Sequence, residues 1–69
     1  MISIFKTNIN SPHDKNQVLD ALTTRFNASA CSVDLEDCDK VLRIVCAQTE
    51  EEMIAQFVQE LGFHCSPLD

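Results

Sequence analysis

Thiols and imidazoles are the side chains that most often bind transition metals, and this chain has both. It contains two histidines, His13 and His64, and four cysteines, namely Cys31, Cys38, Cys46 and Cys65. No two cysteines have the C-x-x-C spacing that marks a zinc ribbon or a thioredoxin-type redox site. We therefore expect four separate thiols, each of which serves as a small apolar residue or lies on the surface.

A second group of reactive side chains is formed by Ser11, His13 and Asp14, which have the residue types of a catalytic triad. Residues two positions apart at the start of a helix point away from each other, so His13 is badly placed to act as a base for Ser11. The chain has one glycine and therefore no glycine-rich phosphate loop. These observations predict that the protein is not an enzyme.

The elements around these residues begin with a strand over residues 2–9, which is rich in β-branched and aromatic residues. The stretch SPHD that follows is typical of a helix start, with Ser11 as N-cap, Pro12 in the first position and Asp14 three residues after the cap. Apolar spacing extends this helix to about Phe26, along a face formed by Val18, Leu19, Leu22, Arg25 and Phe26.

Residues 30–35 and 40–46 are predicted to be the two strands of a hairpin, joined by the turn EDCD. Pairing Leu35 with Lys40 fixes the register of this hairpin. In that register Val33 faces Leu42, and Cys31 faces Ile44.

A second helix is predicted from the capping box formed by Thr49 and Glu52. Its apolar stripe is formed by Ile54, Phe57, Val58 and Leu61, and Gly62 is expected to end it as a left-handed cap. Residues 63–68 can then form a short last strand, in which Pro67 is tolerated at a sheet edge.

The order of these elements is β-α-β-β-α-β, which predicts an α+β, ferredoxin-like sandwich. We expect a single domain over residues 1–69, with a four-stranded antiparallel sheet and two helices on one face.

With these residues in this order, the chain resembles the heavy-metal-associated (HMA) domain of copper chaperones and metal-transporting ATPases. Nearly the whole chain takes part in the resemblance. It rests on FKTNI at 5–9, VD at 33–34, DKVLRI at 39–44 and TEEEMIAQFVQELGF at 49–63. The family's metal site is a C-x-x-C pair at the end of the first strand and in the first turn of the helix.

At those two positions this chain has Ser11 and Asp14. A serine hydroxyl is a poor ligand for a soft metal such as Cu(I), and one carboxylate suits a harder ion. We therefore expect a degenerate HMA-like domain with no thiolate metal site and no cofactor, which acts as a protein-interaction or regulatory module.

The resemblance also implies that the loop after Gly62 lies beside the loop that corresponds to the family's metal site. This would bring together Ser11, Pro12, His13, Asp14, Phe63 and His64, which we predict to be an interaction surface. In an alternative interpretation, His13, Asp14 and His64 bind Zn²⁺ or Ni²⁺ and the protein traffics metal. Phe63 is either an exposed anchor for a partner or a core residue, and the sequence leaves both open.

The charge of the chain limits its partners. Eleven acidic residues against five Lys and Arg give a net charge of −6, which argues against nucleic acid and against anionic membranes. A basic protein partner is favoured, and the domain itself is expected to be a monomer or a weak homodimer. The N-terminal stretch MISIFKTN is too short and polar for a signal peptide, so we expect a cytoplasmic protein.

Overall fold

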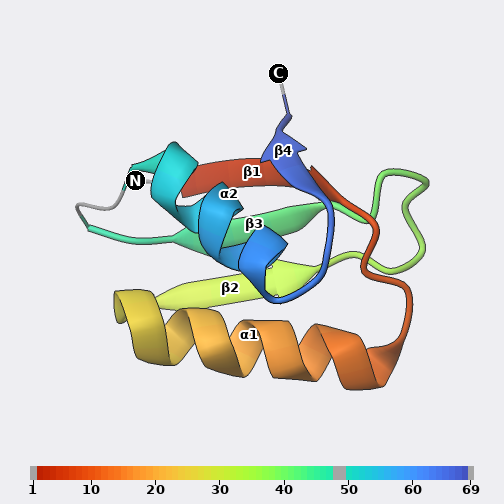
Figure 1. Ribbon diagram of the computed structural model, residues 1–69, viewed down its shortest axis with the longest axis horizontal. Helices are drawn as coiled ribbons and strands as arrows, with labels where there is room; N and C mark the ends of the chain where they lie inside the picture. Colours follow the sequence, from red (N-terminus) through yellow and green to blue (C-terminus); the bar gives the residue numbers. More distant parts are fainter. Residues whose placement is uncertain (1, 48–49, 69) are drawn as a thin grey trace.

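The computed structural model describes residues 2–47 and 50–68. The elements, in chain order, are β1 (Ile2–Thr7), α1 (Pro12–Phe26), β2 (Ala30–Val33), β3 (Leu42–Val45), α2 (Glu51–Glu60) and β4 (Cys65–Pro67). The strands form one antiparallel sheet in the order β2-β3-β1-β4. The predicted ferredoxin-like fold is therefore confirmed, with β1 and β3 in the centre of the sheet (Figure 1).

Both helices pack on the same face of the sheet, and the core lies between these two layers (Figure 1). Every second side chain of β1 and β3 points into this core, so Phe5, Leu42 and Ile44 are fully buried. The buried hydrophobic residues are Phe5, Ile9, Val18, Leu22, Val33, Leu42, Ile44, Cys46, Ile54, Ala55, Val58 and Cys65.

The predicted hairpin is confirmed in register but not in length. Val33 pairs with Leu42 and Cys31 with Ile44, as expected. Lys40 has a left-handed backbone, with φ of 46°, and therefore cannot continue a strand. Instead of pairing across the ladder, its Nζ donates a hydrogen bond of 2.6 Å to the Leu35 carbonyl. The two strands are therefore shorter than the sequence predicted.

Helix α2 begins at Glu51 with Glu50 as its N-cap, and the Glu50 side chain makes no capping hydrogen bond. The predicted capping box depends on Thr49, which lies outside the described residues. Of the predicted stripe, Ile54 and Val58 are buried, and Phe57 packs edge-on against Phe26 with ring centroids 5.4 Å apart.

Leu61, also predicted to be in that stripe, is exposed, because the helix ends there. Gly62 follows with φ of 104° and ends the helix in the predicted left-handed conformation. The last strand, β4, is shorter than the predicted 63–68, and it forms one edge of the sheet.

Candidate functional site

The loop at the start of α1 is built as a helix cap. Ser11 has an extended backbone, and its Oγ accepts a hydrogen bond of 3.1 Å from the Asp14 backbone N–H. Pro12 occupies the first helical position, and the Lys15 N–H closes the first turn on the Ser11 carbonyl at 2.9 Å. The predicted helix start is thus confirmed, and the Ser11 hydroxyl is committed to satisfying a backbone donor.

Hydrogen bonds from Thr7 stabilise this loop. Its buried hydroxyl donates a hydrogen bond to the Lys40 carbonyl and accepts one of 3.2 Å from the Ile9 N–H. Its own N–H bonds to the Asp39 carbonyl at 3.0 Å. β1 ends at Thr7, two residues earlier than the sequence predicted. Sequence reasoning did not single out Thr7, although a threonine after alternating apolar residues is a possible signal.

The loop after α2 lies against the same end of β1. The His64 N–H donates a hydrogen bond of 2.8 Å to Asn8 Oδ1, which joins residues 56 positions apart in the sequence. The Gln59 side chain donates a further hydrogen bond of 2.8 Å to the Cys65 carbonyl. These bonds fix the entry into β4 beside the loop that follows β1. Asn8 is a second residue that sequence reasoning missed.

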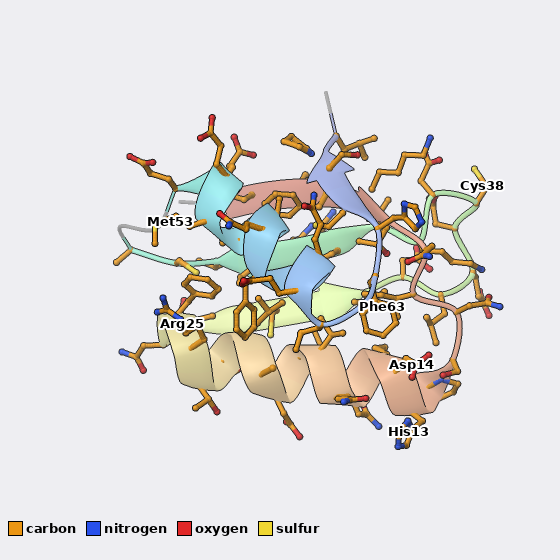
Figure 2. All side chains as sticks on the ribbon, in the orientation of Figure 1. His13, Asp14, Arg25, Cys38, Met53 and Phe63 are labelled. Atoms are coloured by element: carbon orange, nitrogen blue, oxygen red, sulfur yellow. The ribbon has the colours of Figure 1, made fainter. Side chains whose placement is uncertain are left out.

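The predicted surface residues differ in exposure at this end of the molecule (Figure 2). The His13 side chain is 88% exposed, and its Nδ1 lies 3.6 Å from Asp14 Oδ1. Pro12 and His64 are also exposed. Phe63 is half-buried and packs against the core, between the start of α1 and the chain that enters β4. Its burial lies between the two alternatives that the sequence left open.

Beside Phe63 the surface has a shallow hollow of about 390 Å³. It is lined by Gln59, Gly62, Phe63, His64, Cys65 and Ser66. Aromatic residues are enriched at protein–protein interfaces relative to the rest of the surface.

Within residues 2–47 and 50–68, one set of three potential metal-ligating side chains has donor atoms within 4.8 Å of one another, namely Asp37, Cys38 and Asp39. His13, Asp14 and His64 do not form such a set. In the acidic turn, Asp37 Oδ1 already accepts a hydrogen bond of 2.8 Å from the Asp39 N–H. Asp39 Oδ1 lies 3.7 Å from Lys6 Nζ. The turn therefore uses its carboxylates to hold its own shape and to pair with a lysine.

All four thiols are free. Cys38 is exposed, Cys31 lies 3.4 Å from Thr23 Oγ1, and Cys46 and Cys65 are buried. Burial raises the pKa of the Cys65 thiol from 9.0 to about 11, because the thiolate loses its hydration. Cys65 is therefore a neutral apolar residue at ordinary pH.

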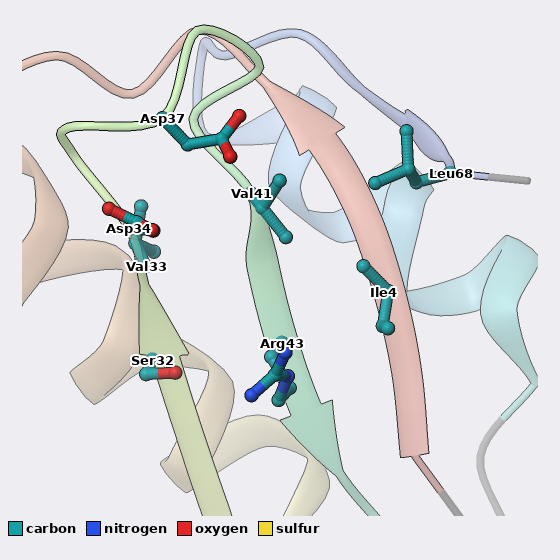
Figure 3. A pocket seen from close by; sticks show the side chains of 8 residues that line it. All are labelled: Ile4, Ser32, Val33, Asp34, Asp37, Val41, Arg43 and Leu68. Atoms are coloured by element: carbon teal, nitrogen blue, oxygen red, sulfur yellow. The ribbon is translucent and has the colours of Figure 1, made fainter.

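A separate hollow of about 580 Å³ lies on the face of the sheet opposite the helices (Figure 3). Ile4 of β1 and Arg43 of β3 line it together with Val41, which directly precedes β3. Asp34 and Asp37 line it at the hairpin turn. The remaining lining residues are Ser32, Val33 and Leu68. Sequence reasoning missed this hollow, although the alternation in VLRIV places Arg43 on the face opposite Leu42 and Ile44.

No family model matches the chain, and neither the curated proteins nor the solved structures contain a match to it. Neither helix of the described chain is long and apolar enough to cross a bilayer.

Proposed function

We propose that this chain is a degenerate HMA-like domain that has no thiolate metal site and acts as a protein-interaction or regulatory module. The observation that carries this proposal is the hydrogen bond of 3.1 Å between Ser11 Oγ and the Asp14 N–H. At the two positions where the resembling family has metal-binding cysteines, this chain has a helix cap. A neutral hydroxyl that already accepts a backbone hydrogen bond offers nothing to a soft metal.

The docking surface in this proposal is formed by Ser11, Pro12, His13, Asp14, Phe63 and His64. Two loops far apart in sequence are tied together by the bond between His64 and Asn8, so the surface is preorganised. The half-buried ring of Phe63 supplies apolar contact, and the exposed histidines supply polar contacts. The net charge of −6 favours a basic partner through electrostatic steering. The proposed function does not involve catalysis.

Variants of the exposed surface test the interaction. The double variant His13→Ala/His64→Ala removes two exposed side chains and should leave the fold intact. Tagged wild-type and variant proteins are compared for the proteins they retain from an extract, with Asp20→Ala on the exposed side of α1 as the matched control. Retention of a basic protein should fall in the double variant and not in the control. Equal recovery by all three proteins would contradict the proposed surface.

Phe63→Ala is the complementary variant. Since the ring is half-buried, its loss should cost about 1–3 kcal/mol of unfolding free energy, less than the 3–5 kcal/mol typical of a fully buried Phe. The affinity for the partner should fall in the same variant. A stability loss without any change in binding would assign Phe63 to the core alone.

A second candidate function is the binding of a harder metal ion by His13, Asp14 and His64. It is favoured by the 3.6 Å approach of His13 Nδ1 to Asp14 Oδ1, which already brings two ligand types together. The His64 imidazole would have to join them while its backbone stays bonded to Asn8.

Calorimetric titration with Zn²⁺, Ni²⁺ and Cu(I) separates the two functions. The interaction proposal expects no tight site for any of the three ions. One equivalent of Zn²⁺ or Ni²⁺ that is lost in His13→Ala would establish the second function instead. One tight equivalent of Cu(I) on folded protein would contradict the loss of the soft-metal site.

A further inference from the structure

The hollow of about 580 Å³ on the face of the sheet opposite the helices has the volume of a small-molecule site, for which about 300–1,000 Å³ is typical. We call it the sheet hollow, and define it by the lining residues that Figure 3 labels. Among the described residues, no helix covers this face (Figure 1). The sheet hollow is therefore accessible from solvent, and the groups that line it determine which ligand it can bind.

The strand register places the lining side chains relative to one another. Arg43 of β3 pairs with Ile4 of β1, and the Leu68 N–H continues this row with a hydrogen bond of 2.9 Å to the Ile4 carbonyl. Val41 lies two residues before Arg43 and therefore points to the same face. The Asp34 N–H donates a hydrogen bond of 2.9 Å to the Val41 carbonyl, which places Asp34 on the other side of Val41 from β1. Arg43 thus has aliphatic neighbours on one side and a carboxylate diagonally across on the other.

The charged groups of the sheet hollow have no ionic partners within the described part of the chain. The guanidinium of Arg43 forms no ion pair with a described carboxylate. Asp34 and Asp37 each accept one hydrogen bond through Oδ1, from the N–H of Glu36 at 3.1 Å and from that of Asp39 at 2.8 Å. Neither of these two carboxylates pairs with a described cation. The sheet hollow therefore offers one cation and two carboxylates to a ligand.

These charges favour a ligand that is itself a zwitterion. By the ordinary spacing of a sheet, the Cα atoms of Arg43 and Asp34 are about 8 Å apart, so one small molecule can contact both side chains. The net charge of −6 opposes the binding of a simple anion, and Arg43 opposes that of a simple cation. A molecule with both an ammonium and a carboxylate group meets neither penalty. The half-buried side chains of Ile4 and Val41, with the partly exposed Leu68 beside Ile4, add an apolar surface.

We propose that the sheet hollow binds a free α-amino acid with a branched aliphatic side chain. The ammonium group of the ligand bonds to Asp34 and Asp37, and its carboxylate bonds to Arg43. The side chain of the ligand packs on Ile4 and Leu68, so the site prefers aliphatic amino acids to small or polar ones. Because the hollow is open to solvent and water competes for the charged groups, the affinity is in the millimolar range. This inference goes beyond the proposed function, which uses a different set of residues.

Titration of the protein with L-leucine tests the proposal, with amide NMR spectra as the readout. The signals of Asp34, Val41 and Arg43 should shift and saturate, which locates the ligand at the sheet hollow. Isocaproate lacks the ammonium group of leucine and isoamylamine lacks its carboxylate, so each should bind at least about tenfold more weakly than leucine. Glycine keeps both charges but has no side chain, and it should also bind more weakly. A wild type without saturable shifts at leucine concentrations near the solubility limit would overturn the proposal.

Two variants test the charged contacts separately. Arg43→Gln removes the contact to the ligand carboxylate, and Asp34→Asn removes a contact to its ammonium while Oδ1 still accepts from the Glu36 N–H. Each should weaken leucine binding at least about fivefold. The matched controls are Arg25→Gln and Asp20→Asn, the same changes at exposed positions of α1, and neither should change the affinity more than about twofold. Leucine binding that survives Arg43→Gln would overturn the proposal, and so would isocaproate or isoamylamine that binds as tightly as leucine. If Asp34→Asn fails to fold, the result with Arg43→Gln decides alone.

Discussion

The two faces of the sheet are built from the same strands, but one is buried against the helices and the other is exposed. On the helical side the strands present Phe5, Leu42 and Ile44, which are fully buried. Within the described residues, no buried side-chain nitrogen or oxygen lacks a hydrogen-bond partner, so the buried side has no unsatisfied polar side-chain atom. On the face away from the helices, which we call the open face, Arg43 in β3 and Asp34 directly after β2 have no ionic partner among the described residues. Alternation lets one short sequence specify a core and an exposed face at once.

The largest expected difference between the faces is in packing. Phe5→Ala should lower the free energy of unfolding by about 3–5 kcal/mol, because it leaves a cavity in a fully buried site. Ile2→Ala, on the same strand but on the open face, should change it by less than about 0.5 kcal/mol in dilute protein. Urea unfolding measures both, and Phe5→Leu is the milder variant if the first does not fold. Equal losses of unfolding free energy at the two positions would contradict the difference between the buried and the exposed face.

A second contrast concerns pH. Burial on the covered face raises the pKa of the Cys65 thiol from 9.0 to about 11, so between these values the thiol ionises in the unfolded chain but not in the folded one. Stability should therefore fall as the pH rises from 9 to 11, by about 2–3 kcal/mol more in wild type than in Cys65→Ala. Below pH 9 the two proteins should have the same pH dependence. Parallel curves throughout would show that the thiol is hydrated in the folded state.

Thr7 gives an effect of intermediate size. Thr7→Val keeps the shape of the side chain and removes the hydroxyl that serves the Ile9 N–H and the Lys40 carbonyl. Leaving these buried groups without a partner should cost about 1–3 kcal/mol. Thr7→Ser, which keeps the hydroxyl, should recover most of that cost. Thermal unfolding compares the three proteins, and a stable Thr7→Val would mean that water replaces the hydroxyl.

The smallest expected effect is at the cap of α1. Ser11→Ala removes the bond to the Asp14 N–H and should cost about 0.5–2 kcal/mol. Ser11→Asp should preserve stability, since aspartate caps a helix as well as serine does. An unchanged denaturant midpoint in Ser11→Ala would contradict the role of Ser11 as a cap and weaken the proposal built on it.

Much of the fold is predictable from the sequence because its signals are local. Ser11 and Pro12 mark one helix start, Gly62 marks a helix end, and alternation in the hairpin sets the pairing of Val33 with Leu42. The predicted strands are too long because their ends depend on other contacts. The left-handed backbone of Lys40 and the bond from Ile9 to Thr7 are properties of packed loops, which propensity does not encode.

The candidate site was less predictable for the same reason. Sequence reasoning named His13, Asp14 and His64, but it had no means of finding that Asn8 bonds to the His64 backbone across 56 positions. It also treated EDCD only as the turn that joins two strands, whereas Asp37 in this turn lines the same hollow as Arg43. A pattern of residue types can identify which side chains share a strand face. It does not identify which charges the folded chain leaves unpaired.

Pro67 has a consequence for aggregation. The Leu68 N–H bonds inward to Ile4, so the nitrogen of Pro67 faces the outer edge of β4, where proline has no hydrogen to donate. A strand that approached this edge would find no hydrogen-bond donor at Pro67, and β4 is only three residues long. The opposite edge, β2, has no proline. We therefore expect strand addition to occur at β2 in preference to β4, which favours the pairing of two sheets over growth into a fibre.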